Sequence, residues 1–260
     1  MWCAARRFDA RFDSRFDSRF DSWLVVTSLV AWALLAFTWS DATLPGLCSA
    51  SLRVPLPDSF SLAFVFNSPA QLAWGWLLML AAMTPPLIAA PLRHVRERSF
   101  AHRRARAMFL FVIGYGAVWM IAGMGLQVIA LAAQLAVSDA LVCLVLAAAA
   151  ATLWQVSPAK QWCLNRCHRR PQLAASGAPA DRAALEFGLS HGAACVGACW
   201  ALMLLPLFVG QGHILAMLAV MVFAVAERLE NAAPLAWRWR GPGKALRIAA
   251  AQARIHLAHR

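Results

Sequence analysis

Acidic residues are scarce in this 260-residue sequence, which has 12 Asp and Glu against 24 Lys and Arg. A basic excess indicates nucleic-acid binding only where it forms a patch on a water-soluble module. Here charged residues of either sign make up only 14% of the chain, whereas apolar residues make up 61%. This composition is atypical of soluble domains and predicts that the lipid bilayer is the solvent. We therefore expect a membrane protein and no nucleic-acid partner.

Several enzyme motifs are also missing from the sequence. It has no G-x-x-x-x-G-K-[ST] loop for nucleotide phosphates and no H-E-x-x-H zinc motif. The segment from Cys163 to His168 reads C-x3-C-H, which is one residue longer than the haem-attachment motif. No catalytic residue is therefore predicted, and any transport would have to proceed without a nucleotide site in this chain.

Long apolar runs are what the sequence has instead. Six segments approach the roughly 20 residues that a helix needs to cross about 30 Å of hydrocarbon. They cover residues 23–39, 70–92, 107–137, 140–156, 188–209 and 213–226. The predicted fold is an all-α, polytopic membrane helix bundle with six transmembrane helices. Residues 1–22 are expected to form a low-complexity leader with an Arg-Phe-Asp-Ser repeat, residues 23–227 the membrane domain, and residues 228–260 a basic cytoplasmic tail.

The distribution of basic residues predicts the orientation of these helices, since cytoplasmic loops carry an excess of Lys and Arg. The leader, the link between the second and third helices, the link between the fourth and fifth, and the tail hold 5, 6, 5 and 7 of the 24. Only Arg53 falls on the opposite side. Both termini are therefore predicted to be cytoplasmic.

Prolines and short connections predict how the helices bend and pack. Pro85, Pro86 and Pro91 lie inside the second apolar run and predict a kink there, because each removes a backbone donor. The connections at residues 138–139 and 210–212 are very short. They predict that the third and fourth helices, and the fifth and sixth, are antiparallel neighbours.

Soft donor atoms are concentrated in the second half of the chain. His191, Cys195, Cys199 and Met203 recur every four residues. At 3.6 residues per turn they share one helix face and climb about 6 Å per step. Sulfur ligands select soft ions such as Cu(I), and imidazole with thiolate also suits Zn(II). Two more thiols precede this helix on the same side of the membrane, so the predicted metal ligands are Cys163, Cys167, His191, Cys195, Cys199 and Met203.

Close helix packing explains the same residues without a metal. Cys and Met are common buried apolar residues, and Gly192, Gly197 and Ala198 give the fifth helix a small-residue surface. Glu227, where the sixth helix reaches the cytoplasm, is expected to pair or to reach the interface rather than to react. Three Met pairs share the four-residue spacing: Met79 and Met83, Met120 and Met124, Met217 and Met221. Spacing alone leaves both interpretations open.

Four stretches between about residues 70 and 230 form a further pattern. They are 76–85; Gly114–Tyr115 with Trp119; 155–160 with Cys163 and Cys167; and His191–Gly192 with Cys195, Gly197, Cys199, Met203, Gly210, Met217 and Glu227. Together they resemble a bacterial family of predicted metal-binding integral membrane proteins of unknown function. The resemblance implies metal binding and a multi-pass protein of the bacterial inner membrane, but no mechanism.

These observations favour a protein that transports copper or delivers it to a metal-dependent partner protein, with copper favoured over zinc. A membrane-bound metalloenzyme and a scaffold subunit without metal stay open as alternatives. The basic tail, with Trp237, Trp239, Lys244, Arg247 and Arg254, is expected to lie on the anionic cytoplasmic leaflet of the lipid bilayer.

Overall fold

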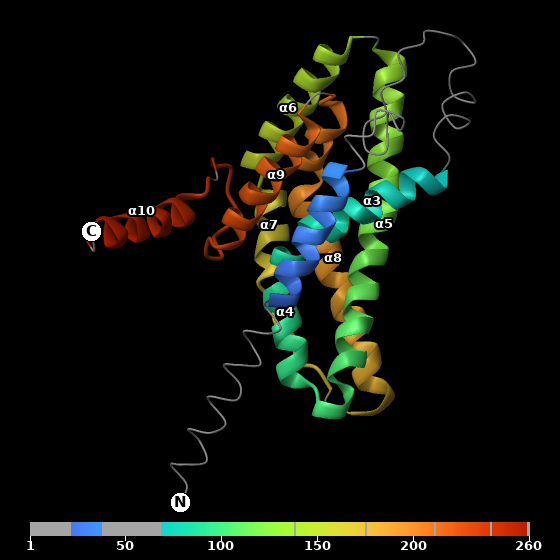
Figure 1. The fold of residues 1–260 in the computed structure, drawn as a ribbon, viewed down its shortest axis with the longest axis vertical. Helices are drawn as coiled ribbons and strands as arrows, with labels where there is room; N and C mark the ends of the chain where they lie inside the picture. Colours follow the sequence, from blue (N-terminus) through green and yellow to red (C-terminus); the bar gives the residue numbers. More distant parts are fainter. Residues whose placement is uncertain are drawn as a thin grey trace, which may run out of the picture.

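The computed structural model describes residues 22–37, 69–137, 139–174, 176–210, 212–239 and 241–258, and every regular element in these ranges is helical (Figure 1). The all-α prediction is therefore confirmed. A helix over Ser22–Phe37 comes first. It is followed by α3 (Pro69–Met83), α4 (Pro85–Arg98), the short 3-10 helix η1 (Ala101–Arg103), α5 (Arg104–Ala136), α6 (Ala140–Val156), α7 (Pro158–Cys167), α8 (Gly177–Phe208), α9 (His213–Arg228) and α10 (Gly243–Ala258).

Helices α5 and α8 form the most extensive helix contact in the described part of the bundle, and they run parallel to each other (Figure 1). Their backbones touch at glycines. A Cβ added to Gly188 would lie 2.3 Å from the carbonyl oxygen of Phe111, and one added to Gly114 would lie 2.7 Å from that of Leu185. Only residues without a side chain allow helices to approach this closely. The small-residue surface predicted for the fifth apolar run therefore packs against α5.

Length and hydropathy single out two helical stretches that are able to cross a membrane, Ala101–Ala136 and Gly177–Phe208. The number rises to four if each of two bent pairs is one span. These pairs are Leu72–Met83 with Pro85–Arg98, and Ala140–Val156 with Pro158–Cys167. The helix Ser22–Phe37 is shorter, and α9 has 16 residues. The count of six spans and the orientation of the termini therefore stay predictions.

The predicted kink in the second apolar run is confirmed. α3 and α4 meet at Thr84 with a bend of 69°, directly before Pro85. A second bend of 68°, between α6 and α7, was not predicted. It falls at Ser157, whose side chain accepts a hydrogen bond from the Lys160 amide at 3.2 Å, and Pro158 follows at the first helical position. A Ser cap before Pro starts a new helix, so the expected link after residue 156 is helical.

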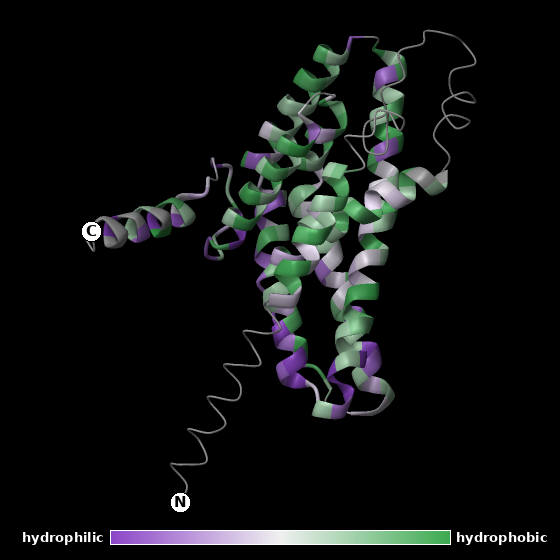
Figure 2. Cartoon of the chain, in the orientation of Figure 1, coloured by the Kyte–Doolittle hydropathy of each residue, from purple (hydrophilic) through white to green (hydrophobic). Residues whose placement is uncertain are grey.

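The fifth apolar helix begins 11 residues earlier than expected, at Gly177 instead of residue 188. Its first turns contain the charged residues Asp181, Arg182 and Glu186, so a helix start predicted from an apolar run excludes them. They are held against the start of α5, because Asp181 pairs with Arg103 at 2.6 Å and with Arg106 at 2.8 Å. Hydrophilic residues gather at this end of α4, α5 and α8 (Figure 2).

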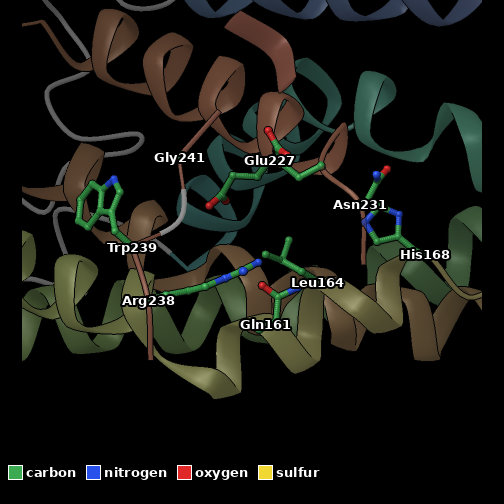
Figure 3. Close-up of a pocket in the computed structure, with 9 residues that line it drawn as sticks. Gln161, Leu164, His168, Glu227, Asn231, Arg238, Trp239 and Gly241 are labelled. Atoms are coloured by element: carbon green, nitrogen blue, oxygen red, sulfur yellow. The ribbon is translucent and has the colours of Figure 1, made fainter. Parts of the chain in front are cut away.

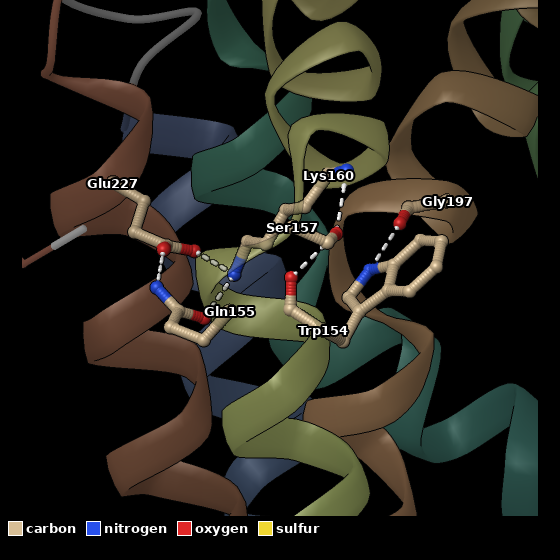
Figure 4. Close-up of polar contacts among 6 residues, drawn as sticks. All are labelled: Trp154, Gln155, Ser157, Lys160, Gly197 and Glu227. Atoms are coloured by element: carbon tan, nitrogen blue, oxygen red, sulfur yellow. Dashed lines mark hydrogen bonds and ion pairs between the residues drawn. The ribbon is translucent and has the colours of Figure 1, made fainter. Parts of the chain in front are cut away.

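α6 packs mainly along α8 and makes little contact with α5, contrary to the expectation from the short connection at residues 138–139. Trp154 explains this preference, because its indole nitrogen donates to the carbonyl oxygen of Gly197 on α8 at 2.9 Å (Figure 4). α8 and α9, joined at residues 210–212, pack together as predicted. The repeat leader up to residue 21 and Arg53 lie outside the described residues.

Candidate metal centre

The predicted column of donors lies on the interior face of α8. His191, Cys195, Cys199 and Met203 are all buried, with exposed fractions of 3%, 0%, 1% and 3%. One face of a helix carries residues four apart, and here that face points into the bundle core. All four side chains are therefore buried in the bundle, and their role as metal ligands stays a prediction.

Cys195 and Cys199 form the centre of this column. They lie one helical turn apart on α8, and both side chains are buried. The hydroxyl of Tyr115 on α5 lies 3.2 Å from the sulfur of Cys195. Tyr115 is the chain's one tyrosine, and both it and Cys195 are buried. Two buried thiols one helical turn apart offer two sulfur donors of the kind that soft ions prefer.

His191 occupies an aromatic box one turn before Cys195. Its ring centroid is 6.0 Å from that of Phe111, 6.1 Å from Tyr115 and 5.8 Å from Phe187. Both ring nitrogens are buried, and neither has a hydrogen-bond partner among the residues that the structure describes. A buried polar atom without a partner is costly and calls for a reason. A neutral imidazole is a common metal ligand, so His191 fits a role as a third donor.

Cys163 and Cys167 of α7 lie at different places relative to this column. A Cβ on Gly197 would be 2.4 Å from the sulfur of Cys163, so Cys163 packs directly on Gly197. Gly197 is two residues from both Cys195 and Cys199, which is about 200° around the helix. Cys163 therefore lies behind the column. Cys167 is half-buried and interacts electrostatically with Cys195.

The described residues contain no group of three or more His, Cys, Asp and Glu side chains placed to hold a metal ion. The six predicted ligands are thus not gathered at one point. What the structure brings together is a sulfur pair, flanked along α8 by one imidazole and one thioether. This arrangement suits an ion of low coordination number better than one that needs four donors.

Glu227 forms an ion pair, as the sequence predicted, but the sequence did not identify the buried Lys160 as its partner. Lys160, with no exposed surface, contacts Glu227 of α9 at 2.8 Å, and Gln155 bonds to both (Figure 4). The sequence did give a signal, since Glu227 ends an apolar helix and needs a partner there.

A polar pocket of about 210 Å³ opens beside this network. It is lined by Gln161, Leu164, His168, Glu227, Glu230, Asn231, Arg238, Trp239 and Gly241 (Figure 3). Asn165 holds the segment after α9 against α7, because its amide donates to the carbonyl oxygen of Ala233 at 2.8 Å. Burial lowers the pKa of His168, and the positive charges of Arg228, Lys244 and Arg170 lower it further.

The segment Gly188–Gly192 spells G-x-S-x-G, the motif of a serine nucleophile. In hydrolases that motif needs a sharp turn between a strand and a helix. Here it lies inside α8, and the hydroxyl of Ser190 donates to the carbonyl oxygen of Phe187 at 3.1 Å. The motif therefore does not define an active site.

The fold and the site define the class of the protein first: an all-helical chain that buries two cysteines, a histidine and a methionine along one helix. The sequence then matches the PpoB2 family, described as copper chaperones, over residues 73–251, which is more than half of its length. The chain belongs to this family. No curated protein and no solved structure matches it. The family supports the expectation of copper handling.

Proposed function

We propose that this protein is a multi-pass membrane copper chaperone, which binds Cu(I) on α8 and delivers it to a partner protein. The observation that carries the proposal is the pair of buried cysteines, Cys195 and Cys199, one helical turn apart on α8. The unpartnered imidazole of His191 supplies a further donor on one side of the pair, and Met203 supplies one on the other.

Coordination chemistry supports copper over zinc at this pair. Structural Zn(II) takes four tetrahedral ligands, whereas the described residues offer no cluster of three His, Cys, Asp and Glu side chains. Thiolate and thioether ligands select Cu(I). Copper is here the cargo, and Cys195 and Cys199 would each give up a proton when they bind it.

Delivery requires a ligand that reaches the surface, and Cys167 meets this condition. It is the half-buried member of the set, and it lies on α7, which packs along α8. We propose that Cys167 exchanges with Cys195 on the ion, so that one Cu–S bond forms as another breaks. A thiol of the partner then replaces Cys167 in the same way. No electron is transferred in either exchange.

The proposed membrane topology has six spans and cytoplasmic N- and C-termini. The parallel course of α5 and α8 supports it, since the third and fifth spans cross in the same direction. The hydrophilic ends of α4, α5 and α8 lie together and would face the cytoplasm of a bacterial cell. α10 projects from the bundle, and the exposed Trp237 and Trp239 precede it, which suits contact with the lipid headgroups.

The test is the copper content of the full-length, detergent-purified protein after reconstitution with Cu(I) under reducing conditions. The double variant Cys195→Ala, Cys199→Ala is expected to lose the bound copper and to keep its elution profile. Cys143→Ala is the matched control. Its thiol is buried too, but it contacts the carbonyl oxygens of Ala133 and Val137 at 3.6 Å, away from the column.

A copper content that is the same in all three proteins would place the ion elsewhere and overturn the proposed site. Absence of copper from the wild type would favour the scaffold subunit. Copper that stays bound while a product forms from an added substrate would favour the metalloenzyme.

A further inference from the structure

Tyr115 on α5 brings a hydroxyl group into contact with the sulfur of Cys195 on α8. The two atoms are 3.2 Å apart, which is within the reach of a hydrogen bond to sulfur. Both side chains are buried, since 3% of the surface of Tyr115 and 0% of that of Cys195 is exposed. The contact is therefore a polar interaction between two helices inside an apolar core, where the strength of a hydrogen bond is not reduced by water.

The close packing of α5 on α8 fixes this contact in space. A Cβ on Gly192 would lie 3.2 Å from the carbonyl oxygen of Tyr115 and 3.3 Å from its Cα, so the two backbones touch within one turn of Cys195. The ring of Tyr115 is stacked on that of Phe111, with centroids 6.3 Å apart, and lies 6.1 Å from the ring of His191. Because both the backbone and the ring are held, the hydroxyl meets Cys195 in a defined position.

The direction of this hydrogen bond depends on whether the sulfur of Cys195 carries a proton. In the thiol form, either the hydroxyl or the thiol is able to donate. When Cu(I) binds, a Cu–S bond replaces the S–H bond, the proton leaves and no electron is transferred. The sulfur then only accepts, and the hydroxyl becomes the donor. A hydrogen bond to a charged acceptor is roughly twice as strong as one between neutral groups, so the contact stabilises the metal-bound state more than the metal-free state.

We propose that Tyr115 is a positioning residue of the copper site, which orients the sulfur of Cys195 and donates a hydrogen bond to it when it holds the ion. Tyr115 does not bind the ion and acts only through the sulfur. The inference rests on the proposed function, because it requires Cys195 to be a ligand. It extends that function, because it assigns part of the copper affinity to a residue of α5, outside the predicted ligand set.

Chelator competition titrations of the full-length protein in detergent test the effect on Cu(I) affinity. Tyr115→Phe removes the hydroxyl and keeps the ring. Ser190→Ala is the control, because the Ser190 hydroxyl also lies on the α5-facing turns of the chain's site helix α8 but donates to the carbonyl oxygen of Phe187 at 3.1 Å. Tyr115→Phe is expected to bind Cu(I) about tenfold more weakly, which corresponds to the difference between a charged and a neutral hydrogen bond. Ser190→Ala should bind Cu(I) as tightly as wild type.

A spectroscopic measurement on the wild type needs no variant. Tyr115 is the one tyrosine of the chain, so labelled tyrosine reports on this residue alone. Nuclear magnetic resonance spectra are recorded with an isotopic label at the ring carbon that bears the hydroxyl, before and after loading with Cu(I). The signal of this carbon is expected to shift on loading, because the acceptor of the hydroxyl changes from a thiol to a metal-bound thiolate.

A Tyr115→Phe variant with the Cu(I) affinity of wild type would overturn the proposal, and so would a tyrosine signal that stays in place on loading. Equal losses in Tyr115→Phe and Ser190→Ala would make Tyr115 a structural residue. If Tyr115→Phe does not fold, the labelled wild type decides. If wild type binds no Cu(I), the proposed function fails together with this inference. If wild type binds Cu(I) and neither the affinity nor the tyrosine signal responds, only the inference fails.

Discussion

The contact between α5 and α8 should not tolerate a methyl group at Gly188. A Cβ at this position would lie 2.3 Å from the carbonyl oxygen of Phe111, whereas ordinary contacts begin at 3.4 Å. The two backbones would therefore have to separate by about an ångström, because a backbone atom cannot rotate away as a side chain can. Overpacking of this kind costs about 1–3 kcal/mol, and the better helix propensity of Ala returns at most about 1 kcal/mol. We expect Gly188→Ala to lose about 1–2 kcal/mol net.

The assay is equilibrium unfolding of the detergent-solubilised protein, with Gly116→Ala as the matched control. Gly116 is also a helical glycine on α5, but a Cβ there meets nothing within 4 Å. The control variant should be as stable as wild type or slightly more stable. If Gly188→Ala unfolds together with Gly116→Ala, the close contact that organises the α5 and α8 pair is not present in the protein.

Three further predictions concern the surroundings of the column. Lys160→Met leaves Glu227 buried and unpaired, so it should lose about 3–5 kcal/mol in an unfolding titration, and adding Glu227→Leu should recover most of this loss. Cys163→Ala should keep the copper content of wild type, whereas Cys195→Ala should lower it; equal losses would mean that Cys163 is a ligand after all. The folded-state pKa of His168 lies below its ordinary value of 6.5, so the unfolded chain takes up its proton first as the pH falls. Stability should therefore decrease below about pH 6.5, and His168→Gln should remove part of that decrease in thermal unfolding measured across the pH range.

Features that depend on a run of residues were predictable from the sequence. The apolar run 140–156 coincides with α6, and Pro85 marks the bend at Thr84. The four-residue spacing on α8 predicted one shared face, and the structure buries that face. These features follow from the helix period and from the missing amide of proline, which are local properties of the chain.

Features that depend on the path of the chain were not predictable in the same way. Cys163 was expected at the same end of the membrane as the start of the column, but the bend at Ser157 turns α7 so that Cys163 packs on Gly197, behind the column. Lys160 looked like an ordinary basic residue of a loop, and only the path of α7 buries it against Glu227 of α9. The spacing of residues along the sequence does not show where these side chains come to lie, because that depends on how the helices pack.

X-ray absorption at the copper edge of the Cu(I)-loaded, full-length protein tests the central claim most directly. The account predicts a low-coordinate Cu(I) shell dominated by sulfur, which is lost in the double variant Cys195→Ala, Cys199→Ala and retained in Cys143→Ala. A shell made of nitrogen and oxygen only, or a sulfur shell that survives the removal of both α8 thiols, would contradict it.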